Sequence, residues 1–127
     1  MLFLLIDEVL EIHAQNIEEF GGSHGVRDIG ALESALLAPE NRACYEEAGL
    51  AVCAATYAYH LSQAHAFIDG NKRIAAAVAE IFLKINQARL NLTNQEIIVL
   101  FLAIASGQQS REQVEQLFLD RLIVLSN

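Results

Sequence analysis

Apolar residues recur at intervals of three and four along most of this chain. One series runs from Ile6 to Phe20 and another from Ile74 to Ile85, each on one side of a helical projection. This spacing is that of an α-helix that buries one face, and the alternation of a strand occurs only briefly, at 90–92. The sequence therefore predicts an all-α fold, a compact bundle of about six helices with at most a short strand or hairpin.

Residues that start and stop helices set the expected boundaries. Gly21 ends the first helix, Pro39 ends a short second one, and Gly107 ends the fifth. A T-x-x-E capping box at Thr93 and an S-x-x-Q box at Ser110 begin the last two helices. The predicted helices cover residues 6–20, 31–38, 50–64, 71 to about 86, 93 to about 106, and 110 to about 125. A glycine-rich loop follows the first helix.

The acidic composition argues against one class of partner. The formal net charge is −8, and the longest basic run is the pair Lys72-Arg73, so the chain lacks the basic stripe that binds nucleic acid. A hydrophobic content of 54% in 127 residues can fill one core, and we expect a single domain over residues 1–127. The apolar stretch Met1–Ile6 is too short for a signal segment or a membrane span. We therefore expect a cytoplasmic protein with no membrane contact.

Three side chains outside any motif are expected to be structural. Cys44 and Cys53 have no metal-ligand partners at a recognisable spacing and lie in or beside apolar helical sequence, so we expect two free, largely buried thiols. His13 lies on the apolar face of the first helix, where a packed, hydrogen-bonded histidine is the usual case.

The segment Asp69–Arg73 stands where a loop gives way to the long helix that begins near Asn71. The unpaired N–H groups of a helix's first turn attract anions, and Gly70 lets the backbone approach a phosphate closely. Arg73 can hold phosphate oxygens bidentately, Lys72 adds a point charge, and Asn71 supplies an orienting amide. The segment therefore predicts a phosphate cradle.

Two further residues turn this cradle into a candidate reaction site. Asp69 is the only carboxylate within the basic cluster, and Mg²⁺ prefers one or two carboxylates together with substrate phosphates. His65, at the end of the preceding helix, has the pKa range in which a side chain can take a proton from a hydroxyl near neutral pH. We interpret Asp69 as the metal ligand and His65 as the general base.

Each of these signals is weak alone, because a lone histidine is usually structural, a Gly-Asn pair is usually a turn, and a Lys-Arg pair is usually solvated. Together, seven specified residues in a nine-residue window between two helices are far more specific. The pattern is His65-x-Phe67-x-Asp69-Gly70-Asn71-Lys72-Arg73.

This pattern resembles the signature of the Fic/Doc superfamily, and the lysine version is typical of its Doc, or death-on-curing, toxins. The upstream segments 21–28 and 32–36 also resemble Doc-type proteins. The resemblance implies that His65 activates a target hydroxyl and that Asp69 binds Mg²⁺. Asn71 and Arg73 would bind phosphate, Gly70 and Lys72 would complete the anion hole, and Phe67 would anchor the loop in the core.

Two positions depart from the pattern of the Fic AMP transferases. Lys72 replaces a glycine of that pattern, and Ala76 replaces its last arginine. The resemblance then implies that ATP is held reversed, with its γ-phosphate at the base. The implied reaction is phosphorylation of a protein serine or threonine, with elongation factor Tu as substrate and arrested translation as the result.

An inhibitory [ST]-x-x-x-E-[GN] motif, which many Fic proteins carry, does not occur in this sequence. Inhibition would then come from a separate chain, and the resemblance implies a toxin paired with a Phd-like antitoxin. Ile74 and Ala66 stand where relatives usually have threonine and proline, and neither substitution removes a catalytic group.

Two other functions stay open at this point. The chain could be an AMP or other nucleotidyl transferase acting on a protein hydroxyl, or a nucleotide-binding module without transfer activity. Arg27 and Asp28, in the glycine-rich loop, are accessory candidates that could border the site and touch nucleotide or target. A loop-stabilising Arg-Asp pair explains them equally well.

Overall fold

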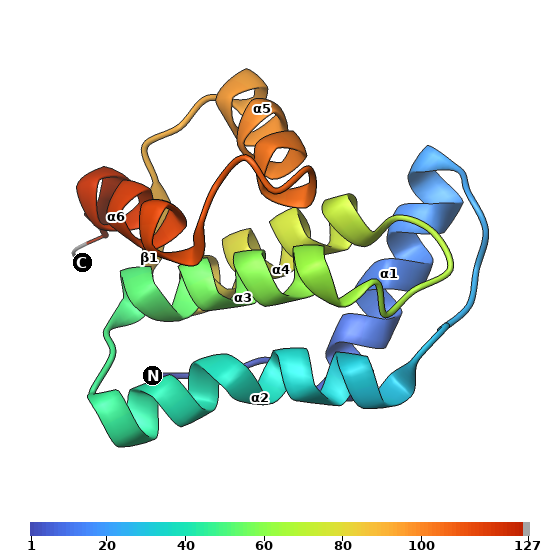
Figure 1. Ribbon diagram of the computed structural model, residues 1–127, viewed down its shortest axis with the longest axis horizontal. Coiled ribbons are helices and arrows are strands. Elements are labelled where there is room, and N and C mark those ends of the chain that lie inside the picture. The colour runs from blue at the N-terminus through green and yellow to red at the C-terminus, as the bar shows by residue number, and fades with distance from the viewer. Residues whose placement is uncertain (126–127) are drawn as a thin grey trace.

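The computed structural model describes residues 1–125, in which six helices surround a common core and two short strands pair near the C-terminus (Figure 1). The helices are α1 (Ile6–Phe20), α2 (Ile29–Glu46), α3 (Leu50–Ala64), α4 (Asn71–Ile85), α5 (Asn94–Ala105) and α6 (Arg111–Arg121). The strands are β1 (Ala88–Leu90) and β2 (Leu122–Val124). The predicted all-α fold with at most a short hairpin is confirmed.

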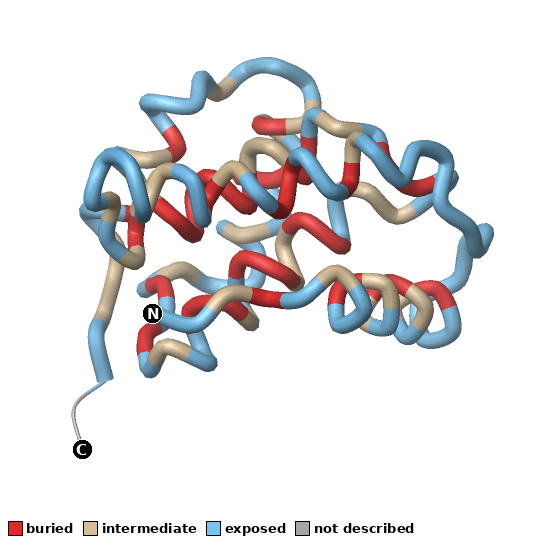
Figure 2. Tube along the Cα trace, turned by 90° about the horizontal axis from the view of Figure 1, so that it is seen from below, coloured by how far each residue is buried: buried red, intermediate tan, exposed pale blue. Residues whose placement is uncertain are grey.

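Helix α3 lies at the centre of the bundle. It packs against α2, α4, α5 and α6, and nine of its fifteen residues are buried. Most of these are small, which lets the neighbouring helices approach closely on several sides. The buried stretches drawn in red in Figure 2 lie mainly on the inner sides of the helices. The end of α3 therefore has a fixed position, and the segment that follows it starts from there.

The predicted end of the second helix is wrong. Instead of stopping near Pro39, α2 begins at Ile29 and continues through the proline to Glu46. A proline inside a helix removes one backbone hydrogen bond and costs about 3 kcal/mol. Tertiary contacts offset this cost: Arg42, beyond the proline, donates to Thr56 of α3 at 3.2 Å and pairs with Glu115 of α6. Pro39 itself is buried in the core.

The C-terminal boundaries also differ from the prediction. The final helix ends at Arg121 instead of continuing to about residue 125, because the chain becomes extended and pairs antiparallel with β1. The register places Leu90 opposite Leu122 and Ala88 opposite Val124. The brief strand expected at 90–92 therefore lies two residues earlier, where it has a partner.

The two cysteines differ in exposure. Both are free, as expected, and Cys53 is fully buried, but Cys44 is exposed on α2, so the expectation of two buried thiols is half wrong. Helix periodicity could not place Cys44 because α2 extends beyond its predicted end. Among residues 1–125, no helix is both long and apolar enough to cross a membrane.

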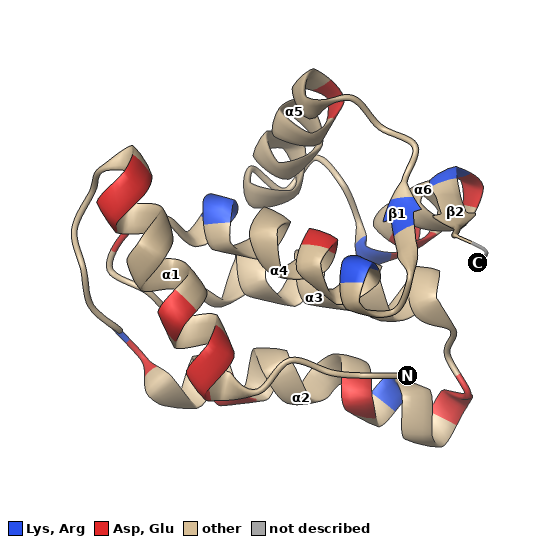
Figure 3. Ribbon diagram, turned by 180° about the vertical axis from the view of Figure 1, so that it is seen from behind, with Lys and Arg blue, Asp and Glu red and all other residues tan. Residues whose placement is uncertain are grey.

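Charge is distributed unevenly over these helices (Figure 3). Helix α1 carries five acidic residues and no lysine or arginine, whereas Lys72 and Arg73 stand in the first turn of α4. The two helices pack against each other. A local basic site therefore lies beside an acidic helix in a chain whose net charge is −8.

Candidate active site

The predicted site lies on the connection between α3 and α4, which we call the site loop (residues 65–70). His65 caps α3 in the left-handed conformation, with φ 49° and ψ 42°. Histidine tolerates this region better than most side chains, although a positive φ remains uncommon outside glycine. Gly70, at φ 77°, is the N-cap of α4. The loop therefore places His65 and the first turn of α4 at its two ends.

Phe67 and Asn71 close the site loop onto itself. Asn71 Oδ1 accepts the Phe67 N–H at 3.0 Å, and Asn71 Nδ2 donates to the Phe67 carbonyl at 2.9 Å. The Phe67 side chain is 1% exposed, as expected for a loop anchor. The amide of Asn71 is thus committed to the loop backbone. The Asn71 backbone N–H, in the first turn of α4, has no acceptor within the helix.

Gly70 is required by its backbone angle and by its neighbours. A Cβ at this position would meet Ile17 Cδ1 of α1 at 3.3 Å and His13 Nε2 at 3.6 Å. Sequence reasoning assigned this glycine to close approach of a phosphate. The structure adds that Gly70 also packs closely on α1, where an added Cβ would require the Ile17 side chain to shift slightly.

Asp69 presents an exposed carboxylate that is fixed by two backbone donors. Its Oδ1 accepts the Gly70 N–H at 2.8 Å, and its Oδ2 accepts the Ser23 N–H at 3.1 Å. These two hydrogen bonds, first that of Ser23 and then that of Gly70, lower the pKa of Asp69 below its ordinary value, and nearby Arg73 lowers it further. The carboxylate is therefore ionised at neutral pH.

This carboxylate fits a magnesium ion that shares its coordination with phosphates. Residues 1–125 contain no cluster of three or more His, Cys, Asp or Glu side chains that could hold a metal by themselves. Mg²⁺ commonly takes one or two carboxylates and fills its other positions with water and phosphate oxygens. A metal at Asp69 would thus depend on a phosphate-bearing ligand.

Lys72 and Arg73 are both exposed in the first turn of α4. The Arg73 guanidinium lies 4.9 Å from the centre of the Phe20 ring, and its Nη1 donates to the Gly21 carbonyl at 3.5 Å. The stacking holds the arginine beside the end of α1.

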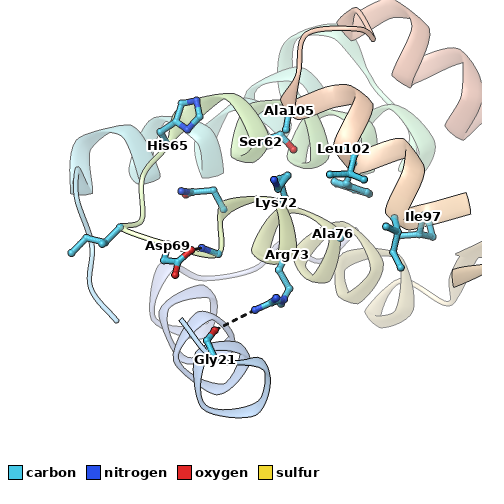
Figure 4. Close-up of a pocket in the computed structure, with 15 residues that line it drawn as sticks. Gly21, Ser62, His65, Asp69, Lys72, Arg73, Ala76, Ile97, Leu102 and Ala105 are labelled. Atoms are coloured by element: carbon cyan, nitrogen blue, oxygen red, sulfur yellow. Dashed lines mark hydrogen bonds between the residues drawn. The ribbon is translucent and has the colours of Figure 1, made fainter. Parts of the chain in front are cut away.

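These side chains line one pocket, shown in Figure 4. Its volume is about 670 Å³, within the usual range for small-molecule sites. One wall is polar and comes from His65 and the residues 69–73, and the opposite wall is apolar and comes from α5. The α5 residues that line it are Ile97, Ile98, Phe101, Leu102 and Ala105. The pocket can therefore hold a ligand that has both an anionic and an apolar part.

Sequence reasoning missed this apolar wall and one buried hydroxyl. The apolar run of α5 is longer than one buried face needs, and that excess was the available signal. Ser62, one turn before His65, lines the pocket, is 2% exposed, and has no hydrogen-bond partner for its Oγ. Nothing in the sequence distinguished Ser62 from other helical serines.

Arg27 and Asp28 do not line the pocket. Both backbone N–H groups donate to the Ala66 carbonyl, at 2.8 and 3.0 Å, and the Asp28 carboxylate caps α2 by accepting the Ala31 N–H at 3.0 Å. Within the described residues, no ion pair joins the two side chains. Their backbone holds the loop 21–28 against the site loop, which neither of the two sequence hypotheses anticipated.

Sequence comparisons with known proteins cover the residues of this site. The sequence model of the Fic/DOC family matches residues 3–83, a range that includes the whole site loop and α4's first turn. The chain is 32% identical over 109 residues to "Protein kinase doc" of Escherichia phage P1, covering 85% of this chain and 86% of that protein. It is 41% identical over 73 residues to "Toxin Doc" of Mycolicibacterium smegmatis, covering 56% of each. The chain therefore belongs to the Fic/DOC family.

Proposed function

We propose that this protein is the toxin of a toxin–antitoxin pair and transfers the γ-phosphate of ATP to a serine or threonine hydroxyl of a cytoplasmic protein. The observation that carries the proposal is one pocket that has His65, Asp69 and Lys72 on its polar side and an apolar wall from α5 on the other. A nucleoside triphosphate has a polyphosphate for the first side and a base for the second. The relatives named a protein kinase and a toxin support the same reading.

In the proposed reaction, the target hydroxyl oxygen attacks the γ-phosphorus as the bond to the β-phosphate oxygen breaks. ADP leaves, and the hydroxyl proton passes to the His65 imidazole. Lys72, Arg73 and the first N–H groups of α4 hold the phosphate oxygens in line. Asp69 would hold Mg²⁺, which when bound neutralises charge on the phosphates. Little covalent chemistry is asked of the protein, so a chain of 127 residues suffices.

Two side chains favour phosphate transfer over AMP transfer. Lys72 and Ala76 both line the pocket. At the corresponding positions, the pattern of the Fic AMP transferases has a glycine and an arginine. The lysine occupies space and adds positive charge beside the first turn of α4, which favours a terminal phosphate there. AMP transfer is the second candidate, because His65, Asp69 and Arg73 are common to both patterns.

Labelled ATP distinguishes the two reactions. The purified chain, incubated with Mg²⁺ and elongation factor Tu, should transfer label from γ-labelled but not from α-labelled ATP. His65→Ala should abolish transfer. His24→Ala should not, because that imidazole contacts Glu18 at the surface, 2.7 Å away, and does not line the pocket. Transfer of the α-label would establish AMP transfer. If no label reached any protein of a cell extract, the chain would be a nucleotide-binding module without transfer activity.

The toxin assignment has a separate test in cells. Expression of the chain alone should arrest growth and translation, and Asp69→Ala should relieve the arrest. Co-expression of the short reading frame expected beside the gene, a Phd-like antitoxin, should relieve it as well. Mass spectrometry of elongation factor Tu from arrested cells should show added phosphate, whereas an unmodified factor would exclude it as the target.

A further inference from the structure

His13 of α1 is a buried polar residue that contacts Phe67 and Asp69 of the site loop. It is 3% exposed, and its imidazole stacks on the Phe67 ring with centroids 3.8 Å apart and planes 13° from parallel. Its Nε2 lies 2.8 Å from the Asp69 carbonyl oxygen. The prediction that His13 is packed and hydrogen-bonded is confirmed. Its hydrogen-bond partner, however, is the backbone of the residue that would bind the metal.

The direction of this hydrogen bond follows from its acceptor. A carbonyl oxygen only accepts, so His13 Nε2 carries the hydrogen. The Asp69–Gly70 peptide is planar and trans, so its carbonyl and its N–H point in opposite directions. The carbonyl is bonded to His13, and the Gly70 N–H is bonded to Asp69 Oδ1 at 2.8 Å. Holding one end of the peptide therefore fixes the other.

Packing alone does not explain a histidine at this position. A phenylalanine would stack on Phe67 and fill the same space, and it would not place a polar group in the core. What only the imidazole adds is the donor to the Asp69 carbonyl. Without that donor, the peptide could turn over and direct its carbonyl toward the phosphate side, where a carbonyl repels an anion. Gly70, having no Cβ, offers little steric resistance to such a turn.

We propose that His13 is a positioning residue, which keeps the Asp69 carbonyl turned away from the phosphate side and the Gly70 N–H on the Asp69 carboxylate, and so aligns that carboxylate. It touches neither nucleotide nor target and acts through one peptide group. This inference rests on the proposed nucleotide site but not on the identity of the protein target.

Two substitutions separate the donor from the stacking. His13→Phe keeps an aromatic ring on Phe67 and removes the donor, whereas His13→Gln removes the ring and places an amide N–H at about the position of Nε2. We expect His13→Phe to lower kcat by tenfold or more, since small misplacements of a reacting group are costly. We expect His13→Gln to have a kcat close to that of the wild type. The affinity for Mg²⁺-tripolyphosphate, measured by calorimetry, should likewise be lowest in His13→Phe. Equal activity of His13→Phe and wild type, or equal loss in both folded variants, would overturn the proposal.

A measurement on the unaltered protein keeps the test valid if either variant fails to fold. Nitrogen-15 NMR of labelled histidine should show His13 with its hydrogen on Nε2, protected from exchange with solvent. A hydrogen on Nδ1 alone would contradict the proposal. If wild type transfers no phosphate, the proposed function fails, while the tripolyphosphate and NMR results still decide the role of His13.

Discussion

The backbone N–H of Ser23 donates to the Asp69 carboxylate at 3.1 Å, which joins the loop 21–28 to the site loop. The Gly25 carbonyl accepts the Ile68 N–H at 3.1 Å, and a single β-bridge pairs Val26 with Phe67. The candidate metal ligand thus also holds the segment that follows α1. Anything that displaces this loop should disturb Asp69, and anything that binds Asp69 acts on the loop.

Gly22→Ala should impair the site. Gly22 has φ 115°, and a Cβ there would lie 2.6 Å from Asp69 Oδ2. Either the loop or the carboxylate must move, so we expect tenfold weaker binding of Mg²⁺-ATP or more, measured by calorimetry.

Gly107→Ala is the control for this variant. Gly107, just after α5, also has a positive φ, 80°, so an alanine there also bears backbone strain, but its Cβ would meet nothing within 4 Å and the residue does not line the pocket. Equal binding losses in the two variants would show that strain, and not the collision with Asp69, is responsible.

Asp69→Asn should separate the charge of this residue from its structural contacts. An asparagine oxygen can still accept the Ser23 N–H, so the loop 21–28 should stay in place, but the side-chain NH2 group cannot accept the Gly70 N–H. The melting temperature should therefore fall only by the loss of this one hydrogen bond. The negative charge is lost, and Mg²⁺ should then no longer strengthen ATP binding. Titrations with and without EDTA measure this difference. Asp120→Asn, an exposed residue of α6 bonded to Gln116, should keep the metal dependence, and a metal-dependent Asp69→Asn would exclude Asp69 as the ligand.

Asn71→Ala should destabilise the fold. It removes both hydrogen bonds to the backbone of Phe67, a buried residue. We expect a loss of about 1–3 kcal/mol in the free energy of unfolding, measured by urea denaturation. Asn41→Ala, at an exposed position of α2, should cost far less. Equal costs would mean that the clamp on Phe67 contributes nothing to stability.

The fold was predictable where one physical effect dominates. Helices α1, α3, α4 and α5 agree with their apolar periodicity and end signals to within about two residues. The end of α2 was predicted wrongly at Pro39, because the rule that proline ends a helix considers only local sequence. The long-range contacts of Arg42 with α3 and α6 outweigh the cost of the proline. The strand at 122–124 could not be read either, because its partner lies more than thirty residues earlier, at 88–90.

The sequence predicted which residues form the site but not which contacts each of them makes. The motif named His65, Asp69, Lys72 and Arg73, and all four line the pocket. That Asn71 binds the Phe67 backbone depends on side-chain geometry that spacing does not specify. The support from α1 joins residues 56 positions apart, His13 and Asp69, and a single sequence carries no signal for such a pair.

Tyr57 predicts how stability should depend on alkaline pH. Its hydroxyl accepts the Leu4 N–H at 3.2 Å in the core, and burial raises its pKa from 10 to about 12. The folded state therefore favours the protonated phenol. The resulting contribution to the free energy of unfolding, on the order of 3 kcal/mol, is fully present below pH 10, the pKa of tyrosine in the unfolded chain. It is lost as the pH rises toward 12. Denaturation curves of Tyr57→Phe should start from a lower stability at pH 7, because Leu4 loses its acceptor, but should decline less between pH 10 and 12. A parallel decline in both proteins would assign the alkaline loss to groups other than Tyr57.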